Sequence, residues 1–248
     1  MTSTSETGHA KNVNNFDELI SFATGYDLAY NPSKASIKLS ALQSLSTDAK
    51  NALKAINTSQ SAYSNAVADR EAAFIPLNKV VTRVLNALKA SGTTDQVADN
   101  AKTIVRKIEG TRATPKKTDA EKTALEAEGK KIIEISASQM SYDSRLANLD
   151  KLIQLLASVT LYIPNEIELK VATLTILHAG LNAKNAAVIG TTAALSNARI
   201  LRNDILYKAD TGLVDVATGT KTYIKSLYGA TGPQYKQVSK LMFRAVKA

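Results

Sequence analysis

The side chains that could do chemistry in this chain are few and lie far apart in the sequence. Only two histidines, His9 and His178, are present, and there is no cysteine. No HExxH motif is present, and the one ExxH spacing, which ends at His9, lies in the N-terminal stretch expected to be a tail, so no metal site is predicted. The absence of cysteine excludes thiolate nucleophiles and cysteine-bound zinc. We expect His9 to lie in a polar tail, and we interpret His178, in an apolar helical context, as a structural residue.

Motifs for phosphate binding and nucleophilic catalysis are also missing. The sequence contains no GxGxxG or GxxxxGK loop and no GxSxG elbow. Glu166 and Glu168 form a carboxylate pair, but acidic residues are ordinary near a helix N-terminus, where they meet the positive end of the dipole. We therefore predict a protein that is not an enzyme, with no catalytic, metal-binding or cofactor-binding residue and no cofactor.

Two arginines, Arg70 and Arg202, occupy equivalent places in two similar segments of the chain. The apolar spacing around Arg70 puts it on an inward-facing seam. A buried guanidinium needs a carboxylate or several carbonyls, because an unpaired buried charge is strongly destabilising. One hypothesis is a polar centre or anion site in the middle of a bundle. The favoured alternative is a pair of structural arginines that fix the register of the helices.

Positive charge is concentrated at the C-terminal end. The formal net charge is +9, and no acidic residue follows Asp215. Such a surface could contact a nucleic-acid backbone or an anionic membrane, although few aromatic residues accompany the charges and no helix-turn-helix or RNP-like motif is present. The alternative is that this basic surface only increases the solubility of the protein. The candidate contacts are Lys102, Arg106, Lys107, Lys221, Lys225, Lys236, Lys240 and Arg244.

The elements that position these residues are predicted to be duplicated. The sequence NFDELI at 15–20 is matched by NLDKLI at 148–153, and each is followed by a Tyr-x-Pro turn, beginning at Tyr30 and at Tyr162. A self-match of this length indicates repetition of one helical unit. The matching helical residues that follow are Lys38, Leu42, Leu45, Ser64 and Arg70 against Lys170, Leu174, Leu177, Ser196 and Arg202.

Composition and periodicity predict an all-α fold. The chain is 44% hydrophobic and 21% charged, contains no tryptophan and has few glycines and prolines. Between residues 36 and 91 the apolar residues recur at alternating three- and four-residue steps, which is typical of long helices packed at a shallow angle. We predict a long-helix antiparallel bundle, built from two duplicated units related by a pseudo-two-fold axis.

The predicted organisation is a disordered tail over residues 1–14 and a single helical-bundle domain over 15–248. The repeat units span about 15–110 and 148–248, with a connecting segment over 111–147. Asn15 is expected to cap the first helix, and Thr118 or Asp119 a charged helix reaching to about Met140. That helix either continues toward Leu161 or breaks near Ser141. Pro76 predicts a kink or break in the first long helix, and Gly212 an interruption in the second.

Localisation is predicted from what the chain lacks. No classical signal peptide is recognisable, and no apolar stretch approaches the roughly 18 residues of a membrane-spanning helix. We predict a cytoplasmic protein, with export by a route that uses no cleaved signal left open.

Three short motifs carry a family resemblance. They are YIPNE at 162–166, LSNAR at 195–199 and YGATGPQYKQVS at 228–239. The combination resembles a family of uncharacterised bacterial all-helical hypothetical proteins. The resemblance implies a helical fold over most of the chain, and it carries no activity or site residue.

The leading hypothesis for function is a non-enzymatic structural or protein-interaction protein, through self-association or another protein partner. The alternative is a nucleic-acid-binding module that uses the basic C-terminal surface without sequence preference. The lesser alternative is a membrane-active helical protein, with 152–163 or 186–195 as the segment that inserts; a membrane partner is the least expected.

Overall fold

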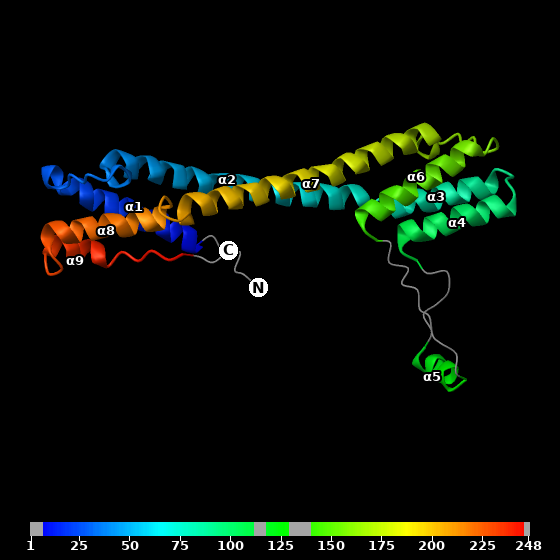
Figure 1. Cartoon of the computed structure of the whole chain (residues 1–248). Helices are drawn as coiled ribbons and strands as arrows, with labels where there is room; N and C mark the ends of the chain where they lie inside the picture. The colour runs from blue at the N-terminus through cyan, green and yellow to red at the C-terminus, as the bar shows by residue number, and fades with distance from the viewer. Residues whose placement is uncertain (1–6, 112–117, 129–139, 246–248) are drawn as a thin grey trace. The chain divides into compact units, whose positions relative to one another are not determined.

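The computed structural model describes residues 7–111, 118–128 and 140–245, and all the regular structure in them is helical, which confirms the all-α prediction (Figure 1). The α-helices are α1 (Thr7–Gly25), α2 (Leu39–Phe74), α3 (Leu77–Ala90), α4 (Asp95–Glu109), α5 (Asp119–Ala127), α6 (Tyr142–Ser158), α7 (Val171–Tyr207), α8 (Leu213–Tyr228) and α9 (Pro233–Ser239). Single 3-10 turns are η1 (Asp27–Ala29), η2 (Ala35–Ile37) and η3 (Ile167–Leu169).

The chain divides into two compact units that cut across the predicted repeats. Unit 1 combines residues up to 64 with residues from 191 onward, and unit 2 consists of residues 65–190. Each unit therefore takes its helices from both predicted repeats, because α2 and α7 each contribute residues to both units. Duplication of a helical unit, and a single domain over 15–248, stay predictions.

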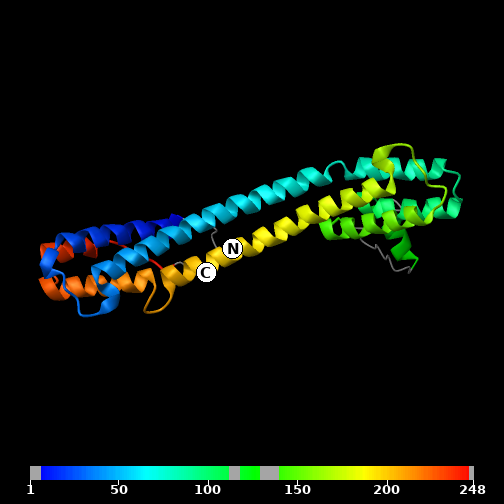
Figure 2. The same cartoon turned by 90° about the horizontal axis from the view of Figure 1, so that it is seen from above.

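Unit 1 is built around α1 and α8, which lie side by side in both views (Figures 1 and 2). The apolar residues of α1 recur at helical spacing, so they form one stripe that faces the core. Residues from the start of α2, the end of α7 and α9 complete this core. Its fully buried side chains include Phe16, Leu19, Leu42, Leu206, Leu213, Ile224 and Val238.

Unit 2 is a second helical core, in which α4 packs against α3 and α6 (Figures 1 and 2). Helix α3 is strongly amphipathic and buries one face. The 3-10 helix η3, which follows the Tyr162 turn, also packs against α3. The core is aliphatic, with Leu77, Val84, Leu88, Ile108, Leu149, Leu152, Leu156 and Leu174 almost fully buried.

The first helix begins earlier than predicted. Helix α1 starts at Thr7, so the prediction of a tail is wrong for residues 7–14, and Asn15 lies inside the helix instead of capping it. The reason is that polar side chains occupy the buried face: His9 and Asn12 are buried beside Val13. A prediction based on the spacing of apolar residues alone does not identify these residues as part of an amphipathic helix.

The breaks expected in the long helices are present. Helix α2 ends at Phe74 and α3 begins at Leu77, because Pro76 lacks the amide hydrogen that would continue the ladder. Helix α7 ends at Tyr207 and α8 begins at Leu213. Asp210 between them has a positive φ of 66°, and a Cβ at Gly212 would lie 2.6 Å from the backbone of Lys208.

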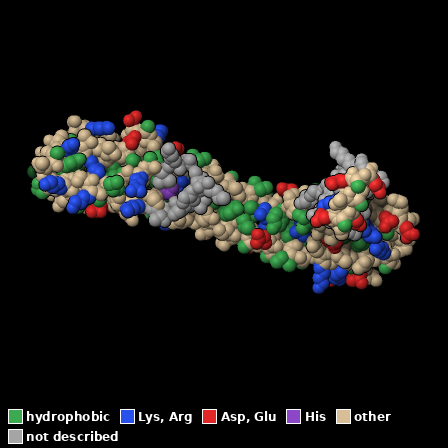
Figure 3. All heavy atoms as spheres, turned by 90° about the horizontal axis from the view of Figure 1, so that it is seen from below, with side chains coloured by type: hydrophobic (Ala, Val, Ile, Leu, Met, Phe, Trp, Pro, Cys, Tyr) green, Lys and Arg blue, Asp and Glu red, His purple; other side chains and the backbone are tan. Residues whose placement is uncertain are grey.

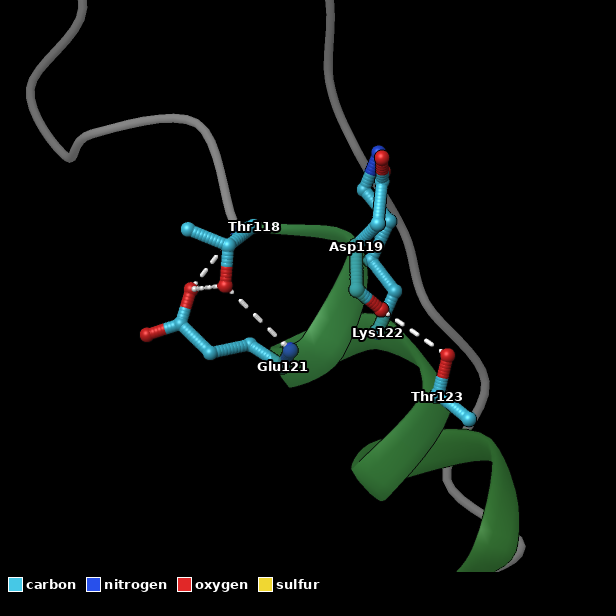
Figure 4. Close-up of polar contacts among 5 residues, drawn as sticks. All are labelled: Thr118, Asp119, Glu121, Lys122 and Thr123. Carbon is cyan, nitrogen blue, oxygen red and sulfur yellow. Dashed lines mark hydrogen bonds and ion pairs between the residues drawn. The ribbon is translucent and has the colours of Figure 1, made fainter.

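The connecting segment contains a capped helix, α5. Thr118 Oγ1 accepts a hydrogen bond from the Glu121 amide at 3.3 Å, and the Thr118 amide donates to Glu121 Oε2 at 2.7 Å (Figure 4). This reciprocal capping box satisfies two otherwise unpaired amides at the start of α5. Residues 129–139 of the predicted charged helix lie outside the described residues. Of the two alternatives for this helix, the structure shows the break near Ser141, because α6 starts at Tyr142 with Ser141 as its cap.

Candidate functional site

Both Tyr-x-Pro turns are fastened in the same way. The Tyr30 hydroxyl donates to the carbonyl oxygen of Ile37 at 2.6 Å, and the Tyr162 hydroxyl donates to that of Leu169 at 2.8 Å. Both tyrosines are buried, and burial raises the pKa of each phenol to about 12. Each bond ties a turn to the 3-10 helix that precedes a long helix. The tyrosines are therefore held neutral in a structural role.

A surface hollow lies beside the second of these turns, in unit 2. It has a volume of about 620 Å³ and lies between α3 and the turn at 161–166. We call it the Tyr162 hollow. Its α3 side includes Arg83, Asn86 and Ala87, and its turn side includes Leu161, Ile163 and Glu166.

Exposed aliphatic side chains lie at the turn side of the Tyr162 hollow and in the 3-10 helix that follows it. Leu161 is 56% exposed and Ile163 is 80% exposed, and both line it. Ile167, in the adjoining η3, is 71% exposed. We refer to these three residues as the Leu161 patch. Clusters of exposed aliphatic side chains are uncommon on soluble monomers and mark contact surfaces.

Two charged residues, Arg83 and Glu166, line the Tyr162 hollow. Arg83 forms an ion pair with Glu168, which is not part of the lining: Nη2 lies 2.9 Å from Glu168 Oε1, and the two side chains are 42% and 60% exposed. The hydrogen bond from Arg83 lowers the pKa of the Glu168 carboxyl. The lining combines Arg83 and Glu166 with amide, hydroxyl and aliphatic groups.

A smaller hollow of about 420 Å³ lies beside the Tyr30 turn in unit 1. Leu28 lines it and is 90% exposed, and Asp27 before it has a positive φ of 47°. The two Tyr-x-Pro turns thus each carry a hollow edged by an exposed leucine. Arg83, which pairs with Glu168, lines the hollow of unit 2.

Arg70 is bound by an amide and an aromatic ring. Its Nη1 donates to Asn185 Oδ1 at 3.1 Å, and Asn185 Nδ2 donates to Asp143 Oδ1 at 2.6 Å. The guanidinium carbon lies 3.9 Å from the centre of the Tyr142 ring, within the range of a cation–π contact. Arg70 therefore links α2, α6 and α7 inside unit 2. These contacts support the structural interpretation over an anion site.

Arg202 has a different environment. It is buried in unit 1, and its Nε and Nη2 donate to Asn203 Oδ1 at 3.1 and 2.8 Å. Arg70 and Arg202 thus belong to different units, each with partners of its own. The apolar periodicity used to predict the helices does not indicate that Asn185 and Asn203 are those partners.

The predicted basic residues divide between the two units. Lys102, Arg106 and Lys107 lie on α4 in unit 2, whereas the residues of the C-terminal group lie in unit 1. The side chains of Lys225, Lys236, Lys240 and Arg244 are exposed. On the face of unit 1 seen in Figure 3, lysine and arginine side chains are scattered among other types and form no continuous patch.

One predicted contact, Lys221, is engaged within the protein. Its Nζ donates to the carbonyl oxygens of Leu241 at 2.9 Å and Ser239 at 3.3 Å, and burial lowers its pKa. Phe243 lies beside the same ammonium, with 5.9 Å between Nζ and the ring centre. Lys221 therefore holds the C-terminal segment against α8.

Residues that the sequence interpretation missed hold the same segment from the other side. Asn12 Nδ2 donates to the Arg244 carbonyl at 2.8 Å, and the Arg244 amide donates to Asn12 Oδ1 at 3.1 Å. His9, placed in the tail by the sequence interpretation, is only 5% exposed, with Nδ1 2.6 Å from the Tyr207 hydroxyl. The polar character of both residues concealed these contacts. His178 lies half-buried in α7.

Within the described residues, no group of three or more histidine, aspartate or glutamate side chains is arranged to hold a metal ion. None of the described helices is long and apolar enough to cross a membrane. Comparison of the chain with protein-family models, with curated proteins and with solved structures finds no match. The resemblance to a bacterial helical family and the cytoplasmic location stay predictions.

Proposed function

We propose that this chain is a non-enzymatic helical scaffold that works by binding protein, with self-association through the Leu161 patch as its first form. The observation that carries the proposal is the exposure of Leu161, Ile163 and Ile167 beside a surface hollow of about 620 Å³. Burial of apolar surface contributes about 25 cal/mol per Å², so covering these side chains would favour association. The surrounding Arg83–Glu168 pair supplies a polar rim, as protein interfaces usually have.

The test is sedimentation of the wild-type chain against a double variant, Ile163→Glu with Ile167→Glu. Two carboxylates in the patch would have to be desolvated on association, so the variant is expected to sediment as a monomer under conditions where the wild type associates. Ile200→Glu, at an isoleucine of α7 that is 57% exposed and outside the hollow, is the matched control. Equal association of wild type and double variant would contradict the patch as the interface.

The second candidate function is sequence-independent binding to nucleic-acid backbone. It is favoured by the exposure of Lys225, Lys236, Lys240 and Arg244 in a C-terminal end without acidic residues. Counterion release predicts an affinity that falls steeply with salt. Replacing Lys236, Lys240 and Arg244 with glutamine should flatten the salt dependence of binding to a mixed-sequence duplex. No binding at low salt would contradict this candidate.

A membrane-active role has less support, because the candidate segment 152–163 begins inside a core. Leu152, Ile153 and Leu156 are buried in unit 2, so insertion would require that core to open. Dye release from anionic vesicles is the corresponding measurement, and the scaffold proposal predicts none.

A further inference from the structure

The cores of both units are shared between the two halves of the chain. We define the N-terminal half as residues 7–111 and the C-terminal half as residues 140–245. In unit 1, Phe16 and Leu42 of the N-terminal half share a core with Leu213 and Ile224 of the C-terminal half. Unit 2 repeats the arrangement, and neither half holds a complete core of its own. Its corresponding residues are Leu77 and Leu88 from the first half, and Leu149 and Leu174 from the second.

Polar contacts within unit 1 also run from half to half. The Tyr26 hydroxyl donates to the Gln234 carbonyl at 3.0 Å, and Asn15 Nδ2 donates to the Met242 carbonyl at 2.7 Å. Asn12 exchanges two hydrogen bonds with the backbone of Arg244. Polar side chains of the N-terminal half thereby form hydrogen bonds with backbone groups of the C-terminal half.

The same is true within unit 2. Lys184 Nζ lies 2.7 Å from Asp69 Oδ2, and Arg145 Nη2 donates to Asn78 Oδ1 at 2.9 Å. The Arg70–Asn185 and Arg83–Glu168 pairs join the halves as well. A large apolar contact with polar bonds around it is the pattern of an obligate subunit interface.

The helix of the connecting segment, α5, lies outside both shared cores. No described residue of α5 belongs to either core, and its described side chains are exposed apart from the half-buried Lys122. Within α5, Thr118 exchanges hydrogen bonds with Glu121, and the Thr123 hydroxyl donates to the Asp119 carbonyl (Figure 4).

We infer that the two halves of this chain are each other's binding partners, and that the matching half of a second copy can replace the chain's own. The half from a second copy has the same apolar face and the same polar side chains as the chain's own half, so it can form the same contacts. Exchange of this kind yields particles in which the N-terminal half of one copy pairs with the C-terminal half of another.

The test is to cut the full-length chain between its halves. A protease recognition sequence is inserted after Glu128 or, as a second variant, after Met140, which are both described as non-helical and exposed. Before cleavage, a circular dichroism spectrum equal to that of the wild-type chain shows that the insertion is tolerated. After cleavage, native mass spectrometry is expected to find both fragments in one particle with the mass of the whole chain.

Exchange is then measured by mixing cut protein with isotopically heavy cut protein, unfolding the mixture in urea and refolding it. Hybrid particles with one light and one heavy half are expected at about half of the total, as random pairing requires. Uncut light and heavy proteins, treated identically, supply the control, since they cannot form hybrids of single-chain mass. Fragments that separate and remain individually helical, or cut pairs that refold without hybrids, would overturn the inference.

This inference is independent of the Leu161 patch. The cut protein carrying Ile163→Glu and Ile167→Glu should form hybrids to the same extent as the cut wild type, because neither residue belongs to either core. Loss of self-association with unchanged exchange would thus support both proposals. Absence of hybrid particles in the cut wild-type protein would count against the exchange of halves and would leave the Leu161 patch proposal unaffected.

Discussion

The Tyr162 hydroxyl donates a hydrogen bond to the Leu169 carbonyl at 2.8 Å, closing the turn that carries the Leu161 patch. Both residues are buried, so removing the hydroxyl leaves a carbonyl without a partner away from water. Tyr162→Phe is expected to lower the free energy of unfolding by about 1 to 2 kcal/mol. Urea denaturation measures the change. Tyr63→Phe, at a half-buried tyrosine of α2, is the control, and an equal loss in both variants would contradict the assigned role.

The same two tyrosines predict a limit to stability at alkaline pH. Burial raises the pKa of Tyr30 and of Tyr162 from 10.0 to about 12. A phenol ionises more readily in the unfolded chain, so the stabilisation from these groups is complete below pH 10.0 and is lost as pH rises through about 12.

Tyrosinate absorbance checks this pH dependence. Tyr30→Phe with Tyr162→Phe should remove the latest-ionising step of the titration. It should also flatten the decline of stability above pH 10.0, the ordinary value of the phenol. A titration that keeps its late step in the double variant would show that other groups cause it.

Arg70 and Tyr142 are expected to be energetically coupled. Arg70→Ala removes a hydrogen bond to buried Asn185 and a cation–π contact, with an expected cost of about 2 kcal/mol. A double-mutant cycle with Tyr142→Leu should give a coupling of about 0.5 to 1 kcal/mol. Arg83→Ala breaks only an exposed ion pair and should cost less than about 1 kcal/mol. A zero coupling energy would contradict the stacked geometry.

Two glycines with equal space around them should respond oppositely to alanine. A Cβ at Gly180 or at Gly229 would meet no atom within 4 Å, but Gly180 lies inside α7 while Gly229 has a φ of 74°. Gly180→Ala is expected to stabilise the protein by about 0.5 to 1 kcal/mol through helix propensity. Gly229→Ala is expected to destabilise it by about 1 kcal/mol, because alanine resists that backbone conformation. Thermal unfolding of both variants decides, and a stabilising Gly229→Ala would contradict the assigned conformation.

The fold class could be predicted from the sequence because the spacing of apolar residues along a helix does not depend on which segments pack together. Heptad-like spacing identified the long helices, and Pro76 located a break, since a proline removes a backbone donor wherever it stands. The pairing of segments was beyond reach. Nothing in the local pattern says that Phe16 packs in the same core as Leu213 while Leu77 shares one with Leu149.

The candidate surfaces were harder to anticipate for two physical reasons. Exposure of Ile163 depends on a turn held by Tyr162, and periodicity does not distinguish an exposed aliphatic residue from a core one. Lysines were counted as free charges, yet Lys221 is bound to two backbone carbonyls. The His9 environment was hidden because its partner Tyr207 comes from the opposite end of the chain.

The scaffold proposal is tested most directly by light scattering coupled to size exclusion, run on nuclease-treated full-length protein at low and high salt. The proposal predicts a particle heavier than the 26.5 kDa single chain that persists at high salt, because apolar burial and not charge holds it together. A 26.5 kDa monomer at both salt concentrations would contradict self-association. A monomer that carries nucleic acid until salt removes it would shift the assignment to the basic C-terminal end.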